Sequence, residues 1–332
     1  MYDGDRRNFY GSTGIRGDAM RRATFVLFAL LASFQGIEII ADSENAAKDD
    51  SLQKVHTRFH NGEIAVGVVI KQHLTFFKAE LSAANTTNQR IRTHRRRVKR
   101  LEQLLAIVEK SNPNESNGDR SIHIVKNALD VALVQLTGVV EANRHKWIAL
   151  KPVSFKLPKD DSAQLLKDDS VLFKSPGPKG SLSRFIFRPA SSQFTHLRFE
   201  AMNDASLPKK GPGRSADGRF LIFAINVYHV SAGQQKYVEI RNAYTDHEDS
   251  SNPVEAAKDF LSDTCWIAPT SEFAHEPVTA VFEFWEPLKL GTGDHLEIVL
   301  DAGHNDQRTP GRVRFSIAST PNPKTANKNG KR

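Results

Sequence analysis

The feature that most constrains the fold is a change in the spacing of apolar residues at Trp147. Upstream of it, Leu101, Leu104 and Val108 recur at intervals of three and four residues, as on one face of a helix. After a polar loop the same spacing returns at Ile122, Val125, Leu129, Ala132, Leu136 and Val140. Two such stripes joined by a short loop predict an antiparallel helical hairpin over residues 63–146. Residues 64–70 are rich in valine and isoleucine and fit either a strand or a buried helix.

Downstream of Trp147, short apolar or alternating segments are separated by turns rich in glycine and proline. The candidate strands are residues 170–174, 184–188, 195–201, 220–230, 237–241, 278–285, 295–300 and 313–318. Many short strands with little helical periodicity between them indicate an antiparallel sandwich. We therefore expect an α+β chain in separate domains, with the helical hairpin followed by an all-β jelly roll over residues 147–320.

The N-terminal region has the form of an export signal. Met20, Arg21 and Arg22 precede an apolar run at residues 23–32, which is too short to cross a bilayer comfortably. We expect translation to start at Met20, with residues 1–41 comprising a mis-called start and a signal peptide cleaved after Ala41. The protein would then be secreted or periplasmic, with no stable membrane span. A retained membrane anchor is the alternative.

The basic charge of the chain is concentrated in two segments. The net charge is +8, and residues 90–100 hold seven basic side chains and no acid. A basic tail at residues 321–332 adds more, and residues 42–62 are a polar, flexible lead-in. Because the charge is local, the fold as a whole is not expected to bind nucleic acid. The basic run is either a solvated helix face or a contact for an anionic polymer, surface or partner.

The sequence lacks the motifs of common catalytic and cofactor sites. A single cysteine, Cys265, excludes an internal disulfide, a four-thiolate zinc site and haem attached through two thiols. No nucleophile elbow, phosphate-binding glycine loop or zinc-protease helix is present. The histidines of the β region show no ligand spacing, so no metal site is expected, although oxygen-rich loops could hold calcium. A polysaccharide-active enzyme would need two acids converging in a cleft, drawn from Asp204, Asp217, Asp246 and Asp249.

Residues 203–214 form a loop with a restricted path, because two prolines and two glycines fall within seven residues. Arg214 could clamp this loop through backbone carbonyls, or it could belong to a recognition edge. If a sugar binds there, Trp266 or Trp285 would stack on it while Arg214 or Asp204 bonds its hydroxyls. Packing is the alternative role for each tryptophan. The candidate ligand-binding residues are Asp204, Arg214, Asp217, Trp266 and Trp285.

This loop carries a family resemblance. Residues 197–208, 211–214 and 218–221 closely resemble a segment of the β domain in planctomycete-type secreted cytochrome c multidomain proteins. Residues 147–152, 169–172, 263–267, 281–284 and 311–317 extend the similarity, with Cys265 where that family has glycine. The resemblance implies a secreted, galactose-binding-like sandwich that engages carbohydrate. It does not imply electron transfer, because the chain has no haem-binding motif and no room for the flanking domains.

Together these observations predict a secreted, non-catalytic binding module that recognises a glycan or a secreted protein partner through the loops of its sandwich. A structural role is the first alternative: the hairpin would self-associate like a coiled coil, or dock onto a cytochrome-bearing relative. A polysaccharide-active enzyme is the second.

Overall fold

The computed structural model describes residues 66–84, 86–111, 116–174, 176–178, 180–190, 193–259, 263–269, 273–303 and 307–319. All the described residues belong to one compact unit. The expected signal peptide, the lead-in at residues 42–62 and the tail at residues 321–332 lie outside the described residues.

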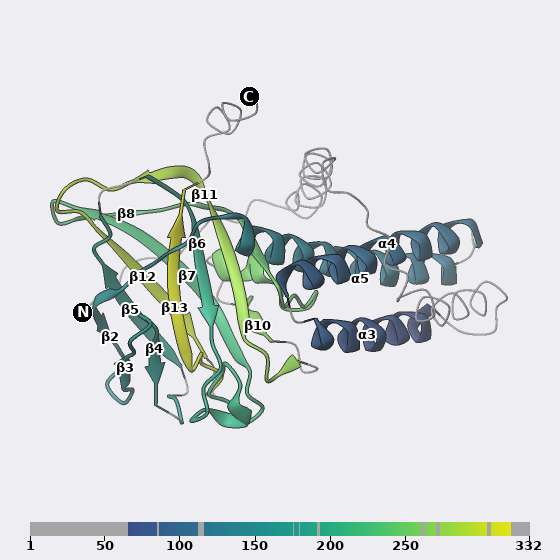
Figure 1. Ribbon diagram of the computed structural model, residues 1–332, viewed down its shortest axis with the longest axis horizontal. Coiled ribbons are helices and arrows are strands. Elements are labelled where there is room, and N and C mark those ends of the chain that lie inside the picture. Colours follow the sequence, from purple (N-terminus) through teal and green to yellow (C-terminus); the bar gives the residue numbers. More distant parts are fainter. Residues whose placement is uncertain are drawn as a thin grey trace. The chain divides into compact units, whose positions relative to one another are not determined.

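The helical part contains both predicted helices and a further one. Within the described residues, the α-helices are α3 (Val66–Ala83), α4 (Thr87–Ser111) and α5 (Ser116–Arg144) (Figure 1). The two apolar stripes pack as expected, since Leu104, Val108 and Val125 are buried together. The valine-rich segment at residues 64–70 contributes its described part to α3, and Val66 and Val69 join the same cluster.

The basic run at residues 90–100 lies on α4 and is only partly solvated. The guanidinium of Arg97 is buried and donates to the side-chain oxygen of Gln135 on α5. Arg96 pairs with Glu80 of α3 at 3.1 Å. The interpretation as a solvated helix face therefore fails at Arg97, and part of the charge ties the three helices together.

The β part consists of two antiparallel sheets. Within the described residues, sheet A runs β3 (Ala163–Leu165), β4 (Val171–Phe173), β13 (Arg312–Ala318), β6 (Gln193–Ala201), β11 (Val278–Lys289) and β9 (Ile240–Thr245), with β1 (Ile148–Ala149) also paired to β13. Sheet B runs β10 (Trp266–Ala268), β7 (Phe220–Ser231), β12 (His295–Ala302), β5 (Ser181–Phe187) and β2 (Pro152–Lys156), with β8 (Gln234–Tyr237) also paired to β7. The prediction of helices followed by an antiparallel two-sheet sandwich is confirmed.

Most of the predicted strands are present, and one is wrong. Residues 237–241 are not a single strand, because Tyr237 ends β8 in sheet B and Ile240 begins β9 in sheet A. The chain crosses between the sheets at the two residues between them. The sequence also missed β1, β2, β3 and β10, which have two to five residues each. Strands this short leave little alternation to read.

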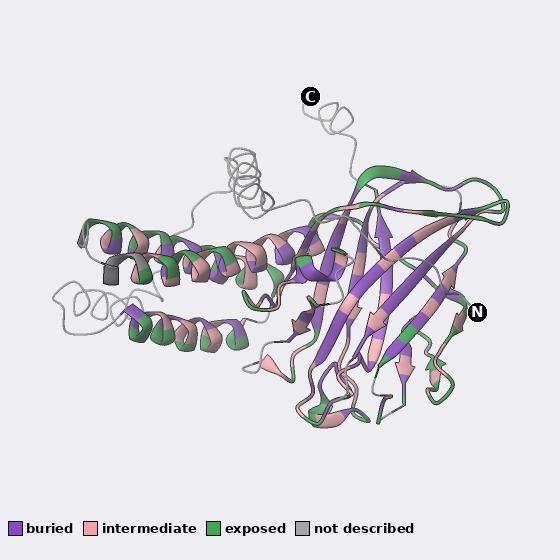
Figure 2. Cartoon of the chain, turned by 180° about the vertical axis from the view of Figure 1, so that it is seen from behind, coloured by how far each residue is buried: buried purple, intermediate pink, exposed green. Residues whose placement is uncertain are grey.

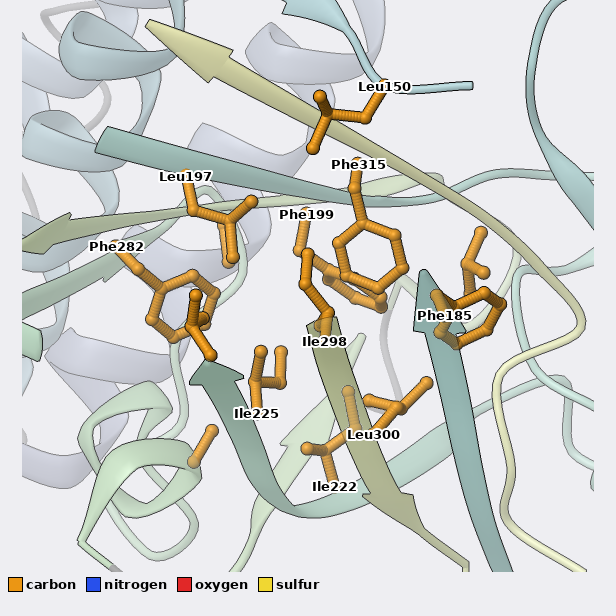
Figure 3. Packing of buried hydrophobic residues seen from close by; sticks show 14 of the residues in the cluster. Leu150, Phe185, Leu197, Phe199, Ile222, Ile225, Phe282, Ile298, Leu300 and Phe315 are labelled. Atoms are coloured by element: carbon orange, nitrogen blue, oxygen red, sulfur yellow. The ribbon is translucent and has the colours of Figure 1, made fainter. Parts of the chain in front are cut away.

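The core lies between the two sheets and is rich in phenylalanine. Figure 3 shows Phe185, Phe199 and Phe315 converging with aliphatic side chains from both sheets. The rings of Phe199 and Phe315 lie 5.6 Å apart, and those of Phe185 and Phe315 lie 5.3 Å apart. Buried and more exposed positions alternate along β5, whereas Leu296–Leu300 of β12 are all buried; Figure 2 colours buried residues purple and partly exposed residues pink.

Helix α5 packs against strands β9 and β11 of sheet A. Gly138 permits this contact, because a Cβ there would lie 2.4 Å from the backbone carbonyl carbon and oxygen of Thr245. Within the described residues, the segment Arg120–Arg144 of α5 is the one stretch long and apolar enough to cross a membrane, by length and composition. In this fold that segment packs on α4 and on sheet A.

Candidate functional site

Arg214 acts as a clamp. Its guanidinium donates to both carboxylate oxygens of Asp161, at 2.6 and 2.9 Å, and to the hydroxyl of Thr309 at 2.7 Å. It also donates to the carbonyl of Lys174 at 3.1 Å and lies over the ring of Phe173. The residue is 2% exposed. Arg214 is therefore an internal clamp, as expected, but it bonds one backbone carbonyl only, and its main partners are the side chains of Asp161 and Thr309 from other segments.

Asp204 and Asp217 stabilise turns. Hydrogen bonds from the backbone N–H and the hydroxyl of Ser206 lower the pKa of Asp204. Burial would raise the pKa of Asp217, but hydrogen bonds from Ser215 and Arg219 outweigh burial and hold that pKa at about 2. Both acids are ionised at neutral pH, and both accept hydrogen bonds from neighbours close in sequence.

The two tryptophans have opposite environments. Trp266 is fully buried, and its ring meets those of Phe220 and Phe199 edge-on at 5.4 and 6.0 Å. The expectation that Trp266 stacks on a sugar is therefore corrected, because the ring is part of the core. Trp285 is 52% exposed, with the guanidinium of Arg241 5.3 Å from its ring centre. Trp285 remains a candidate ligand contact.

The other two acids considered for catalysis also bond locally. Asp246 accepts the backbone N–H of Thr279 at 2.8 Å. Asp249 accepts the backbone N–H of Ser251 at 2.8 Å. Each of the four carboxylates thus serves the strand or turn that carries it or lies beside it, and this arrangement lends no support to a paired acid and base.

The outward face of sheet B presents a different set of side chains. Residues directly opposite on neighbouring strands share a face. The pairs Ile186–Glu297, Glu297–Tyr228 and Tyr228–Tyr237 therefore form one row across β5, β12, β7 and β8. Arg184, Val299 and Asn226 form the next row. We call this surface the tyrosine face, made of Arg184, Ile186, Asn226, Tyr228, Tyr237, Glu297 and Val299.

Glu297 lies at the centre of the tyrosine face. Its carboxylate pairs with the guanidinium of Arg184 and accepts the side-chain N–H of Gln235 at 3.1 Å. Beside it, the rings of Tyr228 and Tyr237 meet at 69° with centres 5.8 Å apart. Burial and the proximity of Tyr228 raise the pKa of Tyr237 to about 12, so its hydroxyl stays protonated. Partly exposed aromatic rings next to fixed donors and acceptors suit a ligand with both apolar and hydroxyl surfaces.

A cavity of about 390 Å³ lies between the helices and the loop that follows β9. Phe77, Leu81 and Val131 supply its apolar wall, and Arg97 and Glu248 lie at its polar side. Burial raises the pKa of Glu248 to about 8, so the carboxyl is largely neutral at pH 7. Arg97 already bonds within the helical part, and Glu248 accepts a backbone N–H from the short helix η3 (Val254–Lys258). We interpret this region as packing.

Two histidines and a glutamate meet where α5 ends. Glu141, His145 and His196 each offer one ligand atom, and these atoms lie within 4.8 Å of one another. All three residues are buried. The sequence predicts no metal site, because the histidines of the β region show no ligand spacing. His196 lies on β6, far in the chain from Glu141 and His145. Only the spacing of Glu141 and His145, four residues apart at the end of a helix, was visible beforehand.

No protein-family model matches the chain, and none of the curated proteins matches it. The resemblance to the planctomycete-type cytochrome c proteins therefore stays a prediction from the sequence.

Proposed function

We propose that this protein is a secreted, non-catalytic binding module that holds a carbohydrate on the tyrosine face of sheet B. The sandwich is of the jelly-roll, galactose-binding-like type in this proposal, as the family resemblance implies. The proposal moves the ligand from the loops to the sheet because Arg214 and Trp266 are committed to the interior.

The row of Glu297, Tyr228 and Tyr237 is the observation that carries the proposal. With Ile186 it crosses four strands, a width of about 14 Å at the usual strand spacing. The tyrosine rings offer faces for the C–H surface of a sugar, and the partly exposed side chains of Asn226 and Arg184 offer donors for its hydroxyls, while the buried Glu297 holds Arg184 in place. The helices pack on β9 and β11 of sheet A, which leaves the tyrosine face on the opposite side of the sandwich.

Affinity electrophoresis of the full chain in gels that contain single polysaccharides tests the proposal. We expect at least one polysaccharide to retard the native protein. Tyr228→Ala and Tyr237→Ala should each weaken binding at least about tenfold, as truncation of a central aromatic contact does. Trp285→Ala is the matched control, because it removes an exposed aromatic ring from sheet A and should leave retardation unchanged.

Two results would contradict the proposal. Retardation by no polysaccharide, with binding of a secreted protein instead, would favour a protein partner. Loss of retardation in Trp285→Ala, with both tyrosine variants unchanged, would move the site to the end of β11.

A further inference from the structure

The junction between the helical part and the sandwich contains a cluster of metal-ligating side chains that the proposed function does not use. Glu141 and His145 lie at the end of α5, and His196 lies on the outward face of β6. The three are 6–7% exposed. Their ligand atoms are within 4.8 Å of one another, whereas ligands of one zinc ion in tetrahedral geometry lie about 3.4 Å apart. Small side-chain rotations would close this difference.

The hydrogen bonds of His196 leave one ring nitrogen ready to bind a cation. Its Nδ1 lies 2.8 Å from the hydroxyl of Thr195, and that hydroxyl donates to the carbonyl of Ala318 at 3.4 Å. A hydroxyl has one proton, so the arrangement in which Thr195 donates to Ala318 and accepts the Nδ1–H of His196 leaves the lone pair on Nε2. A neutral imidazole with a lone pair on one nitrogen is the form that ligates a metal ion.

His145 has an unmet hydrogen-bonding atom. Its Nε2 lies 2.8 Å from the carboxylate of Glu141, and its ring centre lies 4.2 Å from that of His196. Its Nδ1 is buried and has no hydrogen-bond partner among the residues that the structure describes. Buried polar atoms are normally bonded, so an orphaned nitrogen points to a missing cation when its ring lies next to a second imidazole and its other nitrogen bonds a carboxylate.

We infer that Glu141, His145 and His196 bind a divalent transition-metal ion, with zinc as the ion that suits this donor set. Two imidazoles and a carboxylate are ligands that zinc takes, whereas calcium and magnesium require oxygen ligands throughout. The ring of Trp147 covers the cluster, with its centre 5.5 Å from that of His145, and its Nε1 donates to the carbonyl of Ala142. Because the cluster is buried, the ion ties the end of α5 to β6 and has a structural role.

One basic residue competes with the ion. Arg144 donates to Glu141 at 3.3 Å, and its side chain is half exposed, so it can turn toward solvent when the ion binds. The inference therefore predicts different effects on zinc affinity for changes at the ligands and at Arg144. Removing a ligand should weaken zinc binding, and removing Arg144 should preserve or strengthen it.

Equilibrium dialysis of the full chain against zinc chloride tests the inference, with bound zinc measured by atomic spectroscopy. We expect one zinc ion per native chain and a rise in the melting temperature on loading. His145→Ala and His196→Ala should each lower zinc affinity by more than about 100-fold. That is the largest loss typical of replacing a residue that only hydrogen-bonds a metal ligand. His123→Ala is the matched control, because His123 is an exposed histidine on the same helix.

Cobalt substitution keeps the test decisive if an alanine variant fails to fold. The native chain loaded with Co²⁺ should show the visible absorption of a protein-bound ion, and zinc should abolish it. Arg144→Ala should bind zinc at least as tightly as the native chain. Zinc retention no higher than the dialysis blank, full retention in both histidine variants, or the absence of a cobalt spectrum would each overturn the inference. None of these results depends on carbohydrate binding.

Discussion

The contact between Arg214 and Asp161 allows one sharp prediction about stability. Replacing Arg214 by methionine keeps most of the side-chain volume and removes the guanidinium. The change deletes the paired hydrogen bonds to Asp161 and those to Thr309 and Lys174. The carboxylate of Asp161 then stays inside the protein without its counter-charge, because the two side chains are 1% and 2% exposed.

The size of the effect follows from that burial. Removing one partner of a buried ion pair typically costs about 3–5 kcal/mol, because the remaining charge has lost both water and its partner. Arg219→Met is the matched control. Arg219 pairs with Asp217 at 2.8 Å, but those side chains are 21% and 35% exposed. A pair as accessible as this contributes about 0–1 kcal/mol.

Urea unfolding of the full chain, with linear extrapolation to water, measures both free energies. We also expect the double variant Arg214→Met, Asp161→Leu to lose less unfolding free energy than the two single variants lose in sum. The difference should be about 0.5–3 kcal/mol. A cost for Arg214→Met no larger than that for Arg219→Met would refute the clamp. Intact stability with lost polysaccharide binding would instead place Arg214 in a recognition edge.

Three further predictions concern helix docking, pH and the tryptophans. Gly138→Ala should destabilise the protein by about 1–3 kcal/mol in thermal unfolding, because its methyl group would collide with β9, whereas Gly67→Ala, in open space, should be neutral or stabilising by up to about 1 kcal/mol. Burial raises the pKa of Glu248 from 4.5 to about 8, so the folded state binds its proton more tightly than the unfolded chain does. The stabilisation is complete below about pH 4.5 and is lost as the pH rises through 8; Glu248→Gln should remove this component from a pH series of unfolding free energies. Trp266→Ala should cost about 3–5 kcal/mol by chemical unfolding, and Trp285→Ala no more than about 1 kcal/mol; equal costs would contradict the assigned burial.

The regular strands could be predicted from the sequence because their alternation is local. In β5, Phe185 and Phe187 point inward while Arg184 and Ile186 are partly exposed, and this period of two is visible in the sequence. The local sequence pattern does not predict a strand boundary that depends on tertiary contacts. Nothing in the sequence near Tyr237 shows that the chain leaves sheet B after it, since pairing with β7 and β11 determines the break.

The candidate sites show the same limit. Trp266 lies in β10, which has three residues and gives no period from which its direction can be read. His196 could be assigned to a strand, but only the packing of α5 on sheet A brings it to His145. The tyrosine face was likewise hidden, because Tyr228 and Glu297 become neighbours through strand register. Residue type and spacing in the sequence locate single helices and strands. A site built from several of them can be predicted only when it is known which strands pair and how the helices pack.

The position of the last strand has a consequence for synthesis. β13 lies between β4 and β6 in sheet A, although it comes last in sequence among the strands of the described residues. Before residues 312–318 are synthesised, the edges of β4 and β6 that later pair with β13 have unpaired backbone N–H and C=O groups. Unpaired strand edges of this kind can pair with strands of other chains. Sheet A therefore becomes continuous only once residues 312–318 have been translated, and a product that stops before Arg312 would leave the facing edges of β4 and β6 unpaired.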